Sequence, residues 1–129
     1  MLVFVEGWQM ECCGPAFEVG DHVEWMARRP SEEWLAAVLD PGLARRIEHA
    51  EEHHHRELSE VYPLRGRVRA IQAAYGRYAE SPPGSRMLYP VPGSATLVEV
   101  SRADGSQRDT ESLDFNGFLV ELDPDDSSA

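Results

Sequence analysis

The chain has 129 residues, of which 42% are hydrophobic and 27% are charged, as is usual for one globular domain. Its net charge of −11 disfavours nucleic acids and anionic membrane surfaces as partners, because both bind clusters of basic residues. All 12 basic residues are arginine, which excludes Schiff-base enzymes and P-loop nucleotide hydrolases, since both use a lysine.

The first part of the chain predicts strands. Residues 2–8 carry apolar side chains on both faces, which is typical of a buried strand. A turn follows at Gly14. In residues 17–19 and 23–25, on either side of a bend at 20–21, apolar side chains occur at every second position. This alternation predicts a pair of short strands.

Two helix starts follow along the chain. Ser31 is a good N-cap, and the apolar residues after it predict a short helix. Asp40 and Pro41 repeat the start signal. From Leu43 onward, apolar residues recur at spacings of three and four, which predicts a second helix that ends before Pro63.

The second half of the chain reads as β-structure. Its short apolar segments are rich in valine, leucine and aromatic residues, and they lie at 64–71, 86–92, 96–102 and 115–122. The pair at 104–105, Asp-Gly, predicts a hairpin between two of these segments. Residues 80–85 predict a surface loop.

These elements predict a single α+β domain over residues 1–123. We expect a small curved β-sheet or barrel of five or six mostly antiparallel strands, with a two-helix insertion between strands 2 and 3. Residues 124–129 predict a disordered acidic tail. Small barrels often leave one aromatic-lined groove open to a ligand, but we expect most of the aromatic side chains in the core. They are Trp8, Trp25, Trp34, Tyr75, Tyr78, Tyr89, Phe115 and Phe118.

The cysteines indicate a reducing compartment. Cys12 and Cys13 are adjacent, and neighbouring α-carbons lie ~3.8 Å apart, closer than ordinary disulfides allow. The amino terminus lacks the basic region of a secretory signal, and no apolar run approaches the roughly 20 residues that span a bilayer. We therefore expect a cytoplasmic protein with free thiols.

The densest polar cluster is rich in histidine and glutamate. On a helix, His49 and His53 stand one turn apart on one face, the spacing with which two imidazoles hold one metal ion. With Glu52 between them, the string also fits the inverted zinc-peptidase motif, in which the glutamate would activate a metal-bound water. A third acidic ligand is then needed, and nothing in the sequence selects Glu99 or Glu121 for it. A chance match is the rival interpretation.

A zinc site without catalysis is the alternative. Cys12 and Cys13 supply thiolates, and His49 and His53 supply nitrogens, so four such ligands would close a tetrahedral site. Adjacent cysteines rarely bind one zinc together, which leaves a site of one cysteine and two histidines as the simpler form. The structural interpretation is a solvated face of an acidic helix for the histidines and a buried turn for the cysteines.

Residues 7–25 read Gly-Trp-Gln-Met, then a Cys-Cys-Gly turn, then a Val-Gly-Asp strand that ends in Trp. This pattern resembles the opening of a family of uncharacterised actinobacterial proteins. Residues 49–54 and 88–93 resemble the same family, so the resemblance covers most of the chain. The sequence departs at Pro15-Ala16, where the family places a spacer before the proline. The family has no assigned activity, so the resemblance implies a complete domain and supplies no function.

Our leading hypothesis is a non-enzymatic binding or regulatory module of a small β-barrel type. The short strands favour it, together with the lack of a complete catalytic set of residues. We expect the partner to be a protein or a small molecule, and neither nucleic acid nor a membrane; a homodimer is compatible with the sequence. The alternative is a zinc protein, structural or hydrolytic. A third interpretation is a thiol-based redox protein.

Overall fold

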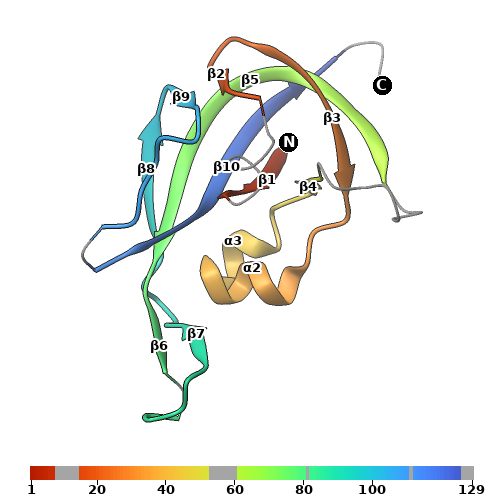
Figure 1. Ribbon diagram of the computed structural model, residues 1–129. Helices are drawn as coiled ribbons and strands as arrows, with labels where there is room; N and C mark the ends of the chain where they lie inside the picture. Colours follow the sequence, from red (N-terminus) through yellow and green to blue (C-terminus); the bar gives the residue numbers. More distant parts are fainter. Residues whose placement is uncertain (8–14, 53–60, 81, 111, 126–129) are drawn as a thin grey trace.

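The computed structural model describes residues 1–7, 15–52, 61–80, 82–110 and 112–125. Its main sheet has six strands: β1 (Leu2–Glu6), β3 (His22–Arg28), β4 (His49–Glu51), β5 (Tyr62–Gly76), β8 (Thr96–Val100) and β10 (Asp114–Pro124). The strands follow the order β10, β1, β4, β3, β5, and β5 also pairs with β10, so these five form a closed ring (Figure 1). β1 and β4 run parallel, and the other pairings are antiparallel. The predicted curved, mostly antiparallel sheet is confirmed.

Two small strand pairs complete the β-structure. β2 (Phe17–Glu18) pairs with β9 (Arg102–Ala103). β6 (Tyr78–Glu80) pairs with β7 (Leu88–Pro90) in a hairpin that continues β5 and β8. This hairpin projects away from the ring (Figure 1).

Two short helices, α2 (Glu32–Val38) and α3 (Pro41–Ala44), lie between the second and third strands of the main sheet, as predicted. The Ser31 hydroxyl accepts a hydrogen bond from the backbone N–H of Trp34 at 3.4 Å. The Asp40 carboxylate accepts one from the N–H of Leu43 at 2.7 Å. Both predicted caps are therefore present. Among the helices that the structure describes, none has the length and apolar character needed to cross a membrane.

The long second helix predicted from Pro41 to Pro63 is wrong. α3 ends at Ala44, and residues 49–51 form the strand β4. The apolar residues Ile47 and Ala50, which suggested a helical stripe, are buried at 5% and 4% exposure. β4 lies between β1 and β3, and pairing with them satisfies backbone groups that a helix would have satisfied internally.

The hairpin predicted at Asp104-Gly105 is also wrong. β8 and β10 do not pair with each other in the described sheet; both pair with β5, one on each side of residues 71–75. The chain leaves β8, forms β9 against β2, and then turns at Gly105, whose φ is 78°. The turn signal was correct, but β5 lies between the two strands that were expected to pair.

β5 is 15 residues long and bends through most of the ring (Figure 1). Two irregularities in its pairing with β10 leave Asn116 and Arg69 without an opposite residue. Such bulges increase the local twist and bend a strand, which allows a sheet to close. Gly117 follows the first bulge with a φ of 151°, and a Cβ there would collide with the backbone oxygen of Val5.

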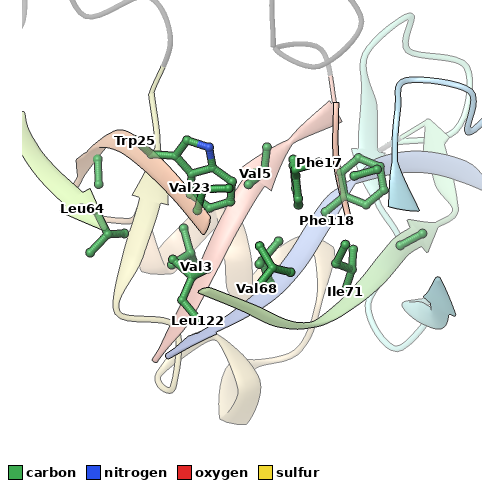
Figure 2. Packing of buried hydrophobic residues seen from close by; sticks show 14 residues of the cluster. Val3, Val5, Phe17, Val23, Trp25, Leu64, Val68, Ile71, Phe118 and Leu122 are labelled. Carbon is green, nitrogen blue, oxygen red and sulfur yellow. The ribbon is translucent and has the colours of Figure 1, made fainter. Parts of the chain in front are cut away.

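β1 is buried on both faces, as its sequence predicts. Val3 and Val5 point into the ring (Figure 2), whereas Phe4 packs on the other side against α2, with its ring 5.6 Å from that of Trp34. The inner cluster comprises Val3, Val5, Phe17, Val23, Trp25, Ala27, Leu64, Val68, Ile71, Ala73, Ala103, Phe118, Val120 and Leu122. The helices therefore cover the outer face of β1 and leave the inner cluster to the strands.

The carboxyl-terminal strand ends beside β3. β10 runs to Pro124, and the Asp125 carboxylate lies 2.7 Å from Nε2 of the exposed His22. The first two residues of the predicted tail are thus attached to the fold. Residues 126–129 lie outside the part of the chain that the structure describes.

Candidate functional site

The predicted histidine pair does not stand on a helix. His49 belongs to β4, so the spacing of one helical turn to His53 does not apply. Its Nδ1 lies 2.7 Å from the hydroxyl of Tyr62, and the two rings meet edge to face. Burial lowers the pKa of His49, although the charge of Glu48 opposes this. His49 is therefore positioned by a tyrosine; His53, Cys12 and Cys13 lie outside the described residues.

The acidic residues considered as ligands also lie apart from His49. Glu99 is exposed on β8. Glu121 on β10 pairs with Leu2 of β1, whereas His49 pairs with the next residue of that strand, Val3. Neighbouring residues of a strand point to opposite faces of the sheet, so the side chains of Glu121 and His49 lie on opposite faces. Within the described parts of the chain, no three or more histidine, cysteine, aspartate or glutamate side chains form a group that could hold a metal.

Glu52, the residue considered as a catalytic base, belongs to an ion-pair cluster around Arg28. Nε of Arg28 donates to Glu52 at 3.0 Å, and its NH2 group donates to Glu6 at 2.7 Å. Both carboxylates are largely buried, with side-chain exposures of 8% and 17%. This cluster was missed in the sequence, because its members are more than 20 residues apart along the chain and no local pattern joins them.

Glu51 is a second buried acid, on the inner side of the ring. It pairs with Ala27, whose side chain belongs to the inner cluster, so the Glu51 side chain points the same way. Only 2% of it is exposed. Burial raises the pKa of Glu51 to about 8, and the charges of Glu52 and Glu6 add to the shift. At neutral pH the protonated form of Glu51 therefore predominates.

Trp34 on α2 stands between two neighbouring cavities. One, of about 410 Å³, lies over the outer side of the sheet and is lined by Phe4, Glu6, Arg28, Leu35 and Ala50. The other, of about 430 Å³, lies between α2 and the β6–β7 hairpin and is lined by Glu33, Ala37, Tyr78, Leu88, Tyr89 and Pro90. Ser31 and Trp34 line both. We call the two cavities together the Trp34 groove.

The hairpin side of this groove carries an exposed apolar run. Met87 and Leu88 are 61% exposed and Tyr89 is 48% exposed. The hairpin is held to the ring by the Tyr78 hydroxyl, which donates to Asn116 at 2.7 Å. Consecutive large apolar side chains in water usually mark an interaction surface.

The expectation that aromatic residues fill the core holds for part of the set. Trp25 and Phe118 are buried, and Tyr75 and Phe115 pack partly buried against the inner cluster. Tyr89 is the clear exception, because it is 48% exposed on the hairpin that projects from the ring (Figure 1). Those that line the open groove are Trp34, Tyr78 and Tyr89, whereas Trp8 lies outside the described residues.

Comparison with known proteins adds a family and no activity. No curated protein and no solved structure matches the chain. A family model described as "Family of unknown function (DUF6578)" matches residues 1–124, nearly the whole sequence. The resemblance to an uncharacterised family is thus confirmed at this level. The chain belongs to the family of unknown function DUF6578.

Proposed function

We propose that this protein is a non-enzymatic binding module that holds an extended segment of a partner protein in the Trp34 groove. The observation that supports this most is the exposed run of Met87, Leu88 and Tyr89 beside a groove lined by Trp34. Aromatic side chains that line a concave surface are typical of sites that bind peptides.

The apolar half of the groove suits a large aliphatic or aromatic side chain of the partner. Trp34, Leu88 and Tyr89 present apolar surface, and Pro90 adds a rigid wall. Burying one such partner side chain contributes roughly 1.5–3 kcal/mol, which is enough for an anchor. The Tyr78 hydroxyl is already bonded to Asn116, so it fixes the hairpin rather than the ligand.

The charge of the groove favours a basic partner. Glu33 lines the hairpin half and Glu6 the other half, whereas the guanidinium of Arg28 is shared between Glu6 and Glu52. The net charge of −11 adds a long-range attraction for basic segments and opposes the approach of nucleic acid or a second copy of the chain. We therefore propose a segment that combines lysine or arginine with large apolar residues.

The polar groups near the groove support binding better than catalysis. Arg28 holds two carboxylates, and His49 is bonded to Tyr62. These side chains engage one another, whereas a general base must lie within hydrogen-bond reach of a substrate. These interactions therefore hold the strands and the side chains around the groove in place.

An array of extended peptides tests the proposal, with basic content and apolar content varied independently. We expect the tightest binders to be rich in both, and anisotropy titrations of one labelled binder give its Kd. The double variant Leu88→Ser with Tyr89→Ser should weaken binding at least about tenfold, because two anchoring surfaces are lost. Glu33→Arg should weaken basic peptides further.

Val98→Ser is the matched control, since Val98 is 46% exposed on β8 and lines neither cavity. Its Kd should equal that of the unmodified protein. A lack of any saturable binder, a preference for acidic peptides, or an equal loss in the control would each overturn the proposal.

We also propose that the module acts in the cytoplasm of an actinobacterium. The adjacent pair Cys12 and Cys13, the lack of lysine and the motif at residues 7–25 support this. A thiol titration of the unfolded protein, isolated without reductant, should find two free thiols per chain. A value near zero would count against a reducing compartment.

A further inference from the structure

A third cavity, of about 570 Å³, lies beside the carboxyl end of α3. It is formed where β3 ends, where α3 ends, and where β4 and β5 begin, so residues far apart in sequence line it. Its volume is within the range of small-molecule sites. It shares no residue with the Trp34 groove.

Four charged side chains of both signs surround this cavity: Arg29, Glu32, Arg45 and Glu48. In the described part of the chain, none of the four forms an ion pair, although they border the same space. By contrast, Arg28, next to Arg29, is engaged with two carboxylates. The cavity thus presents two positive and two negative groups that do not neutralise each other directly.

The floor of the cavity is apolar and rigid. Ile47 is 5% exposed and lines it together with the half-buried ring of Tyr62. The Tyr62 hydroxyl is fixed by its 2.7 Å bond to His49. Burial raises the pKa of Tyr62, and the positive charge of Arg29 partly offsets this, which places that guanidinium near the phenol.

We propose that this cavity binds a free α-amino acid with an apolar side chain. The carboxylate of such a ligand is recognised by Arg29 and Arg45, because guanidinium groups bind carboxylates through paired hydrogen bonds. The ammonium group is recognised by Glu32 and Glu48. A ligand with both charges bridges the opposite groups around the cavity, whereas a simple anion or cation meets repulsion from one pair.

Isothermal titration of the full chain with L-leucine and L-phenylalanine tests this directly. N-acetyl-L-leucine lacks the ammonium group and L-leucinamide lacks the carboxylate, so each removes one half of the recognition. We expect saturable binding of the amino acids and at least about tenfold weaker binding of either derivative, since charge-assisted hydrogen bonds are lost.

Two variants assign the charges. Arg45→Gln should weaken L-leucine and N-acetyl-L-leucine and should strengthen L-leucinamide, because one positive charge that repels its ammonium group is removed. Glu48→Gln should weaken L-leucine and L-leucinamide. Arg46→Gln is the matched control, because Arg46 is exposed, adjacent in sequence and outside the cavity. The proposal is overturned by a lack of saturable amino-acid binding, by equal affinity for the derivatives, by binding of inorganic phosphate alone, or by an equal effect of the control.

Discussion

Arg28 on β3 and Glu6 on β1 form a 2.7 Å ion pair across β4, the strand that lies between them in the ring. The same guanidinium holds Glu52, directly after β4, at 3.0 Å. Removing one partner of a buried ion pair leaves the other charges desolvated. We therefore expect Arg28→Met to lower the free energy of unfolding by about 3 kcal/mol, measured by urea denaturation.

The control for that variant is Arg65→Met. Arg65 and Glu24 lie 3.6 Å apart with exposures of 56% and 67%, so water screens their attraction. The expected loss is below about 1 kcal/mol. Similar losses in the two variants would show that the buried cluster around Arg28 has no special role in stability.

Glu51 gives the fold a defined dependence on pH. Its pKa is about 8 in the folded chain against 4.5 for an ordinary glutamate, so the unfolded chain loses this proton first as the pH rises. Stability from this group is fully present below pH 4.5, falls between 4.5 and about 8, and is then lost. We expect Glu51→Gln to match the natural chain at about pH 4, below the pKa of 4.5 for an ordinary glutamate, and to exceed its stability by up to a few kcal/mol at about pH 8.5. Denaturation curves at several pH values that stay parallel for the two proteins would contradict this.

His49 and Tyr62 bear on the zinc hypothesis. Because His49 lies on a strand, and because the described residues contain no group of three or more His, Cys, Asp or Glu side chains that could hold a metal, we expect the untagged protein to contain zinc well below one equivalent. Elemental analysis of protein purified without chelators measures this. Zinc near one equivalent that is lost in both His49→Gln and Cys12→Ser would reverse the expectation and establish a metal site.

Gly117, on β10, is expected to tolerate replacement poorly. Its φ of 151° is unfavourable for other residues, and a Cβ would collide with the backbone of Val5. Gly117→Ala should therefore cost at least about 2 kcal/mol. Gly84→Ala separates the two causes, since Gly84 has a φ of 89° but open space around it. Thermal unfolding should show a clearly smaller loss for Gly84→Ala.

Local signals predicted much of this fold. The caps at Ser31 and Asp40 act on neighbours three residues away, so the sequence alone could identify them. The two-faced apolar pattern of β1 reports burial directly. β4 could not be predicted in this way, because a strand of three residues is too short to show a period, and its pairing with β1 and β3 is set by distant parts of the chain.

The sequence could predict the type of the candidate site, an aromatic groove, but not the residues that line it. Small barrels favour one open aromatic groove, but the sequence could not separate Trp34 and Tyr89, which line it, from Trp25 and Phe118, which fill the core. The difference arises from the projection of the β6–β7 hairpin away from the ring (Figure 1), which leaves an open cavity between the hairpin and α2. The Arg28 cluster could not be predicted from the sequence either, because Glu6 and Glu52 lie near Arg28 only in the folded ring.

Closure of the ring has a weak seam. β4 joins β1 through two residue pairs and β3 through two more, whereas β5 and β10 are joined through ten residue pairs. Local unfolding should therefore begin at β4, and the backbone amide protons of β4 should exchange with solvent faster than the amide proton of Val120 on β10. Separation of β4 from its neighbours would expose Glu51 to water and allow its carboxyl group to ionise. Because ionisation favours the exposed state, the ring should open more often in alkaline solution.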